Sequence, residues 1–304
     1  MGTGQRGSSQ RRAQLIGVAL ANVATLTWAT NMTLGRWLRD DIGPLTLAAS
    51  RFCIASILFA ILLQRRPPEE RRLGKDRWWL LVMGLTGIVF FAPALYLGLR
   101  FTTTVNATLI NGLGPLITGL LAALLIQEPM SRRQVGGAFA GLAGVLVLIS
   151  GGSLALWRSM DINAGDLIMV GAVALWSLYS VLGRRVMRQR SALSATALST
   201  FLALPLLLIA AAWEIYDLGV RLSPQLVVTI LYIGIAPTVV GFLSWNEAIR
   251  RLGSSGAMVF YNTLPLYGAL LGIMLLGETI SWSYLFGGAL IIGGGLYAAR
   301  GQRR

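Results

Sequence analysis

The sequence predicts an all-α integral membrane protein with ten transmembrane helices, arranged as two inverted-topology repeats of five helices. Three observations lead to this prediction: an apolar composition, ten apolar segments of membrane-spanning length, and arginines that alternate between successive connections. A repeat in the sequence then divides the ten segments into two halves.

The composition is that of a membrane protein. Of the 304 residues, 55% are hydrophobic and 12% are charged, about half the roughly 25% of charged residues in a soluble domain. The net charge is +14, from 26 basic and 12 acidic residues. In a soluble protein such an excess would indicate a nucleic-acid partner, but in a chain this apolar it favours arginine-rich cytoplasmic loops.

Several chemistries are excluded by the residues that are missing. There is no histidine and one cysteine, Cys53, so we expect no His-based catalysis, no intramolecular disulfide and no His- or Cys-rich metal site. A Walker A motif needs a glycine six residues before its lysine, and Glu69 stands at that position before the single lysine, Lys75. The chain therefore has no Walker A motif. We therefore predict a protein that is not an enzyme and has no cofactor and no bound metal.

The ten segments are long enough to cross a hydrocarbon core of about 30 Å, which takes roughly 17–25 helical residues. They are 13–34, 44–64, 78–99, 105–126, 134–152, 166–184, 193–213, 225–248, 256–276 and 282–299. The predicted organisation is a basic cytoplasmic tail (1–12), a first five-helix repeat (13–153), a periplasmic connection (154–165), a second repeat (166–300) and a cytoplasmic tail (301–304).

The basic residues predict the orientation in the membrane. Twenty of them lie in the two tails and in the connections that follow helices 2, 4, 6 and 8, whereas five lie in the opposite connections. The positive-inside rule then places both termini in the cytoplasm. The even spread over one membrane face also argues against a nucleic-acid partner, and leaves the lipid bilayer as the surrounding medium.

The chain repeats itself at an offset of about 150 residues. Trp28–Arg36 and Trp176–Arg184 share four of nine positions at an offset of 148. From the third helix onward the offset is 150, as in the pairs Pro115-x12-Glu128 and Pro265-x12-Glu278. Since each half has an odd number of helices, the second half enters the membrane from the opposite side. Many secondary transporters use such an inverted repeat to build a midplane site and to alternate its access.

These residues resemble the EamA-type branch of the drug/metabolite transporter superfamily. The resemblance rests on the paired Pro-x12-Glu, a glycine-rich last helix in each half, Arg51-Phe52 in helix 2 and Ser244–Ala248 in helix 8. It implies a carrier in the cytoplasmic membrane that exports small metabolites, most similar to amino-acid exporters of aromatic or broad range. In that group helices 1, 3, 4, 6, 8 and 9 enclose the cavity, while helices 5 and 10 pack outside.

Other functions stay open. The substrate could instead be a nucleobase, a sugar conjugate or a hydrophobic drug. A channel has no need of an inverted repeat, and a membrane-embedded enzyme would need histidine or clustered carboxylates in mid-span. Our prediction is a monomeric exporter that works by alternating access on a small-molecule substrate, with amino acids expected first.

The candidate substrate-binding residues are polar or aromatic side chains within the spans, where a group that hydrogen-bonds is costly against lipid. They are Thr25, Trp28, Asn31, Tyr96, Asn111, Trp176, Tyr179, Asn246, Tyr261 and Asn262, with Pro115 and Pro265 as hinges. The alternative for the amides is an interhelical hydrogen bond, and for the aromatic rings simple packing. A proline frees a backbone carbonyl, which is tolerated at membrane depth where it lines a wet cavity.

Few charges lie within the spans. Arg51 could attract a carboxylate, but it could equally extend to the interface or cap another helix. Glu247 has the spacing of a helical ion pair with Arg250 and Arg251, and Glu128 and Glu278 are expected to cap the helix that follows each of them. Helices 1, 4, 6 and 9 carry no carboxylate in mid-membrane. We therefore expect an uncharged polar and aromatic site for zwitterionic amino acids.

Overall fold

The computed structural model describes residues 3–127, 131–151, 163–253, 257, 260–261 and 263–299, and in these ranges the chain is helical, without strands. The longer helices are α1 (Thr3–Trp37), α2 (Pro44–Gln64), α4 (Arg77–Gly84), α5 (Phe91–Phe101), α6 (Thr104–Asn111), α7 (Gly114–Leu125), α8 (Arg132–Ile149), α10 (Ala164–Val186), α11 (Ala192–Leu218), α12 (Pro224–Ile233), α13 (Gly241–Leu252), α15 (Thr263–Leu276) and α16 (Trp282–Ala299). Short helices α3 (Pro68–Arg71) and η1 (Gly74–Asp76) lie between α2 and α4.

Seven helical stretches in the described ranges are long and apolar enough to cross a membrane. They are Arg12–Trp37, Pro44–Gln64, Pro68–Phe101, Thr104–Leu125, Ala164–Val186, Ala192–Leu218 and Pro224–Leu252. The other three predicted segments coincide with α8, α15 and α16, helices of 18, 14 and 18 residues. The all-helical membrane fold is therefore confirmed, with seven spans that meet the length and hydropathy expected of a crossing.

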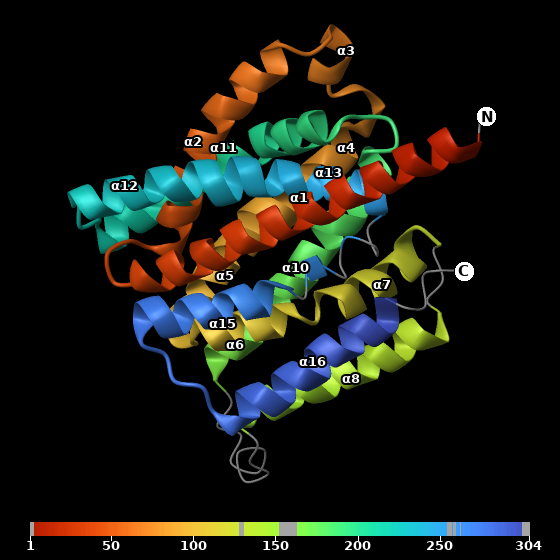
Figure 1. Cartoon of the computed structure of the whole chain (residues 1–304). Coiled ribbons are helices and arrows are strands. Elements are labelled where there is room, and N and C mark those ends of the chain that lie inside the picture. The colour runs from red at the N-terminus through yellow and green to blue at the C-terminus, as the bar shows by residue number, and fades with distance from the viewer. Residues whose placement is uncertain are drawn as a thin grey trace.

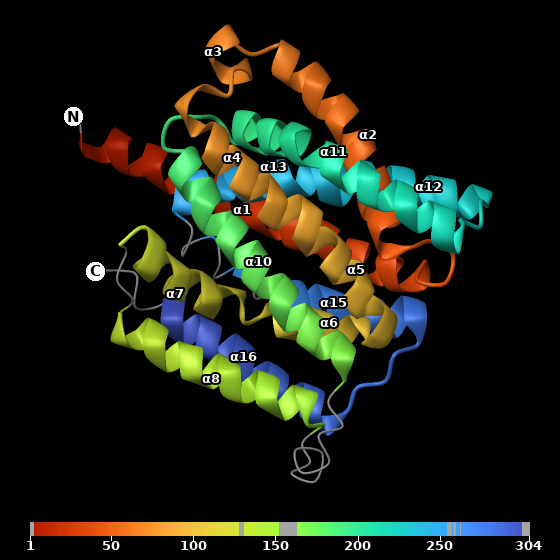
Figure 2. The same ribbon diagram turned by 180° about the vertical axis from the view of Figure 1, so that it is seen from behind.

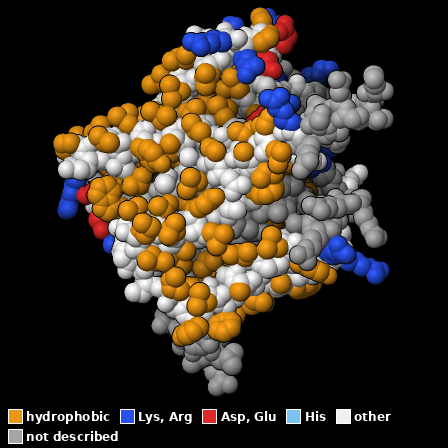
Figure 3. All heavy atoms as spheres, viewed as in Figure 1, with side chains coloured by type: hydrophobic (Ala, Val, Ile, Leu, Met, Phe, Trp, Pro, Cys, Tyr) orange, Lys and Arg blue, Asp and Glu red, His pale blue; other side chains and the backbone are white. Residues whose placement is uncertain are grey.

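The surface agrees with a membrane location. The start of α1 and the end of α16 lie at the same end of the bundle in both ribbon views (Figures 1 and 2). Figure 3 shows hydrophobic side chains over most of one face, with basic side chains gathered toward its edges. Large apolar side chains such as Ile209, Phe139 and Leu124 are exposed, as side chains that face lipid must be.

Two of the stretches contain a wide π-helical turn that the hydrophobic pattern did not predict. Segment η2 (Leu85–Phe90) joins α4 to α5, and η3 (Gly234–Val240) joins α12 to α13. Pro237, inside η3, has no backbone N–H to donate, and the Thr238 hydroxyl donates to the Ile233 carbonyl at 2.6 Å. The predicted helices 78–99 and 225–248 are therefore each interrupted, at positions 150 residues apart.

The fourth predicted segment, 105–126, is broken into α6 and α7. The break falls at Gly112 and Leu113, and Pro115 lies in the first turn of α7, where its missing N–H would have no partner within the helix. Pro265 lies in the first turn described for α15. Pro115 therefore lies near the start of a helix rather than at a kink in the middle of one, whereas the residue directly before α15 lies outside the described residues.

Helices α8 and α16 form a pair at one edge of the bundle (Figures 1 and 2). Their backbones approach closely at glycines: a Cβ on Gly144 would lie 2.5 Å from the Gly287 carbonyl oxygen, and one on Gly294 would lie 2.6 Å from that of Gly137. Small residues at helix contacts permit such packing in membranes. None of the described residues of these two helices lines the central pocket.

Glutamates from the other half of the chain cap two of the helix N-termini. Glu278 accepts hydrogen bonds from the backbone N–H groups of Thr104 and Val105, at 2.8 and 3.0 Å, and pairs with Arg36 at 3.4 Å. In the same way Glu214 accepts from the N–H groups of Leu45 and Thr46. The expectation that Glu278 caps the following helix is wrong, because its carboxylate satisfies the first turn of α6 instead. Glu128 lies outside the described residues.

We expect Glu278→Ala to lower the free energy of unfolding by at least about 2 kcal/mol, because two buried N–H groups lose a charged acceptor worth roughly 1.5–3 kcal/mol per bond. The matched control is Glu247→Ala, which removes the same charge from an exposed ion pair with Arg250 and Arg251. Surface pairs contribute about 0–1 kcal/mol. Melting temperatures in detergent compare the two, and equal shifts would show that the Glu278 cap does not stabilise the fold.

Candidate functional site

A pocket lies at the centre of the bundle, between helices from both halves of the chain. It is lined by Trp28, Asn31, Met32, Arg51, Phe91, Leu95, Trp176, Phe242, Tyr261 and Leu264. The empty space between these atoms is about 310 Å³, but the centre of a water molecule can reach only about 20 Å³ of it. That is room for about one water, so the pocket as it stands is too small for a larger molecule.

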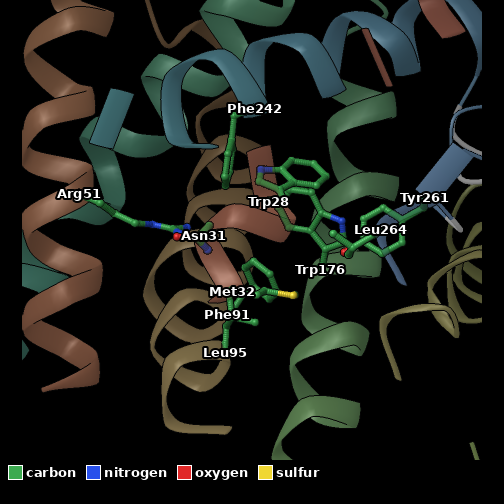
Figure 4. A pocket seen from close by; sticks show the side chains of 10 residues that line it. All are labelled: Trp28, Asn31, Met32, Arg51, Phe91, Leu95, Trp176, Phe242, Tyr261 and Leu264. Atoms are coloured by element: carbon green, nitrogen blue, oxygen red, sulfur yellow. The ribbon is translucent and has the colours of Figure 1, made fainter. Parts of the chain in front are cut away.

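At the polar end of the pocket the lining residues Asn31 and Arg51 form a buried group with Tyr96, which does not itself line the pocket. Tyr96 donates its hydroxyl to the Asn31 side-chain oxygen at 2.6 Å, and Arg51 donates from Nη1 to the Tyr96 oxygen at 2.9 Å and to Asn31 at 3.4 Å. Each of the three is 2% exposed. Figure 4 shows Arg51 reaching in from α2 toward Asn31, on the opposite side of the pocket from Tyr261. A positive charge is thus held at one end of an otherwise apolar cavity.

Aromatic rings form most of the remaining wall. The ring centroids of Trp28 and Trp176 are 4.9 Å apart in a T-shaped contact, and Phe242 meets both rings edge-on at 6.1 and 5.3 Å. Tyr261 lies 6.0 Å from Trp28. Such pairs favour each other beyond the area they bury, and their faces attract cations. The wall can therefore accept an apolar side chain or an ammonium group.

The π-turn in η3 supplies a hydrogen bond that holds Trp28 in place. The Trp28 indole Nε1 donates to the Pro237 carbonyl oxygen at 3.0 Å. In an ordinary helix that carbonyl would be used within the helix, whereas wide turns release backbone groups and occur often at functional sites. The equivalent donor of the second half, Trp176 Nε1, is buried and has no hydrogen-bond partner among the described residues.

A second polar group lies behind Trp176. Tyr179 stacks on Trp176 with centroids 4.8 Å apart, and its hydroxyl oxygen accepts from Asn246 Nδ2 at 3.0 Å. Asn246 also donates to Thr196 at 2.5 Å. Tyr179 and Asn246 do not line the pocket, so the structure places them as supports of Trp176.

The other predicted residues take different positions. Trp28, Asn31, Trp176 and Tyr261 line the pocket. Asn111 does not line the pocket, but it accepts a 2.9 Å hydrogen bond from the hydroxyl of Tyr261, which does.

Three further predicted residues also lie away from the lining. Thr25 is hydrogen-bonded to Thr263 at 2.8 Å and does not line the pocket. Pro115 and Pro265 do not line it either. Asn262 lies outside the described residues, so its predicted role stays a prediction.

The lining contains residues that the sequence analysis did not select. Arg51 was not among the selected residues because its side chain could equally extend to the interface or cap another helix. Its position as the one basic residue well within a span was the signal that could have identified it. Apolar lining residues such as Phe242, Phe91 and Met32 cannot be told from ordinary core residues by type. α2 therefore contributes to the lining, whereas none of the described residues of α6 does.

A buried carboxylate was also missed. Asp166, at the start of α10, is 2% exposed and accepts hydrogen bonds from the Thr102 hydroxyl and from Asn106 Nδ2 at 2.5 and 2.9 Å. It does not line the pocket. Among the described residues no group of three or more His, Cys, Asp or Glu could hold a metal ion. The lining of the pocket offers one cation, hydrogen-bond donors and aromatic faces.

The helical bundle, its lipid-facing surface and its internal pocket define a multi-pass membrane protein with a buried central pocket. Residues 15–150 and 163–299 match the EamA-like transporter family, and the chain belongs to this family, whose members are transporters rather than enzymes. The two matched stretches correspond to the two halves of the sequence repeat.

Individual relatives are similar along almost their whole length. The chain is 30% identical to an uncharacterized transporter, YyaM, of Bacillus subtilis, over 93% of this chain and 92% of the relative. It is 24% identical to a probable terminal-alkyne amino-acid exporter of Streptantibioticus cattleyicolor, over 93% and 94%, and 24% identical to a probable amino-acid metabolite efflux pump of Salmonella typhimurium, over 90% and 92%. A solved crystal structure covers 97% of this chain and 99% of its own, with a TM-score of 0.64 at 25% identity.

Proposed function

We propose that the protein is a monomeric secondary transporter that exports small metabolites, amino acids in the first place, across the cell inner membrane by alternating access. Both termini would lie in the cytoplasm. The observation that carries the proposal is the central pocket, which helices of both halves line together and which combines a buried cation with aromatic faces. The names of two relatives, both amino-acid exporters or efflux pumps, support the substrate class.

The proposed architecture is ten spans in two inverted repeats of five, 13–153 and 166–300. Contacts between repeat-related residues support it. Trp28 meets Trp176, 148 residues later, at the centre of the pocket, and Asn111 is hydrogen-bonded to Tyr261, 150 residues later. Residues that meet their own equivalents lie on a two-fold axis, so a pseudo-two-fold axis would run through the pocket.

Reciprocal contacts support the same axis away from the pocket. Gly144 faces Gly287, and Gly137 faces Gly294, where Gly287 and Gly294 are the 150-residue equivalents of Gly137 and Gly144. A two-fold relation requires this exchange of partners.

The polar pairs repeat as well. Asn31 is hydrogen-bonded to Tyr96 in the first half, and Tyr179 to Asn246 in the second, so the amide and the phenol exchange places between equivalent positions. The two halves thus build the same contact from different residues. Rocking of one half against the other around a fixed site is the motion that such symmetry permits.

The proposal predicts saturable exchange of amino acids by the purified protein. In proteoliposomes loaded with unlabelled phenylalanine, labelled threonine, methionine or phenylalanine is expected to accumulate by counterflow, because a carrier exchanges substrate through one alternating site. Empty liposomes and liposomes with a Trp28→Ala variant are the controls, since Trp28 contacts both halves of the pocket wall. No saturable flux of any of the three would overturn the amino-acid proposal, and single-channel conductance would favour a channel.

A further inference from the structure

The buried charge on Arg51 has no opposite charge beside it. Its guanidinium is 2% exposed, and its polar contacts are the neutral groups of Tyr96 and Asn31. Its other neighbours are the rings of Phe52 and Tyr96, whose centroids lie 4.6 and 5.4 Å from Cζ. Among the described residues no carboxylate pairs with Arg51, and none lines the pocket. Aromatic faces attract a cation, but these neutral groups do not neutralise the charge of Arg51.

A buried cation without a counter-ion is unusual in a membrane-spanning helix. Charged residues inside spans are rare, pair with opposite charge or face a cavity, and mark substrate pathways. A buried charge without a partner is destabilising, so packing alone gives no reason for an arginine here. The missing partner is then expected to be the ligand.

Two hydrogen-bond donors at the pocket are unused. Arg51 Nε and Trp176 Nε1 are both buried and have no partner in the described part of the chain. The acceptor next to Arg51 is already in use, because the Asn31 oxygen accepts from both Tyr96 and Arg51. The Tyr261 hydroxyl donates its hydrogen to Asn111 at the opposite side of the pocket. The end of the pocket around Arg51 therefore fits a ligand group that accepts hydrogen bonds.

We propose that Arg51 is the anion-binding residue of the pocket and that it selects substrates carrying a carboxylate. The inference rests on the proposed transport function and specifies which end of the substrate the protein recognises. A guanidinium and a carboxylate form paired, charge-assisted hydrogen bonds, and the free Nε together with a neighbouring Nη supplies the two donors. The carboxylate also neutralises Arg51, while the apolar part of the substrate lies against the Trp28, Trp176 and Phe242 rings.

The test compares four probes that share one ring and differ in charge: L-phenylalanine, 3-phenylpropionate, L-phenylalaninamide and 2-phenylethylamine. Each competes with labelled phenylalanine for counterflow in proteoliposomes, and each is also tested for thermal stabilisation of the detergent-solubilised protein. We expect the two carboxylates to compete and to stabilise, and the amide and the amine to be at least ten-fold weaker. This comparison uses the unmodified chain and does not depend on a variant that folds.

Variants test whether Arg51 is the residue that produces the preference for carboxylates. Arg51→Gln is expected to remove the ten-fold preference for carboxylates, and Arg51→Lys to keep part of it, since an ammonium retains the charge but not the paired donors. The matched control is Arg100→Gln, which removes another guanidinium with a buried unpartnered Nε. Arg100 donates to the Ile42 carbonyl and does not line the pocket, so the preference should persist.

The outcomes separate the two proposals. If the amide competes as well as phenylalanine, or if Arg51→Gln keeps the preference, the anion-binding inference is overturned while amino-acid transport stands. If no labelled amino acid exchanges, the proposed function fails, and thermal stabilisation decides the inference alone. In that case stabilisation by 3-phenylpropionate but not by 2-phenylethylamine supports anion binding, and any other pattern overturns it.

Discussion

Gly294→Leu is expected to abolish the folded protein or to lower its free energy of unfolding by at least about 3 kcal/mol, the upper end of typical overpacking costs. Even a Cβ at Gly294 would lie 2.6 Å from the Gly137 carbonyl oxygen and 3.1 Å from the Gly141 nitrogen. These are backbone atoms, which cannot move aside as a flexible side chain can. α16 would have to separate from α8 along the whole contact. The measurement is the fraction of monodisperse protein after solubilisation, together with its melting temperature.

The preceding residue provides a matched control on the same helix. A Cβ on Gly293 would meet nothing within 4 Å, and the residue is exposed. Gly293→Leu should therefore be tolerated and should gain up to about 1 kcal/mol from helix propensity. If the two variants melt alike, the close packing of α8 on α16 does not hold this edge of the bundle together.

The spans were predictable because membrane crossing imposes length and hydropathy on a segment. The segments 44–64 and 282–299 coincide with α2 and α16. The wide turns η2 and η3 were not predictable in this way, because a π-turn changes which carbonyl accepts each hydrogen bond and leaves the hydrophobic pattern intact. Pro237 was a local signal for one of them, and its 150-residue equivalent, Gly87, gave none.

The candidate site was predictable where it uses side chains that are rarely left facing lipid. Trp28, Asn31, Trp176 and Tyr261 were selected because polar and aromatic groups within spans need partners, and all four line the pocket. Arg51 was not selected because an arginine within a span could equally extend to the interface or cap another helix.

Whether a buried guanidinium faces lipid, a headgroup or a cavity depends on the rotation and packing of α2 against α5. Sequence spacing does not determine that packing. The structure supplies it through the hydrogen bond from Arg51 to Tyr96.

Asn31→Asp is expected to weaken the binding of carboxylate substrates at least ten-fold and at the same time to raise the melting temperature. The Asn31 side-chain oxygen already lies 3.4 Å from Arg51 Nη1, so an aspartate there would give the buried cation an internal counter-ion. The substrate carboxylate would then have to displace that ion pair and would meet a negative charge. Binding of phenylalanine and 3-phenylpropionate, measured by tryptophan fluorescence, tests the loss.

The opposite signs of the two effects make the result specific to charge. A variant that merely damaged the pocket would lose both binding and stability. Asn111→Asp makes the same chemical change at another buried amide, which accepts from the Tyr261 hydroxyl and has no arginine among its contacts. There an uncompensated buried carboxylate should lower the melting temperature. Unchanged affinity of Asn31→Asp for both carboxylates would mean that Arg51 does not bind the substrate, because its charge would then be neutralised without consequence.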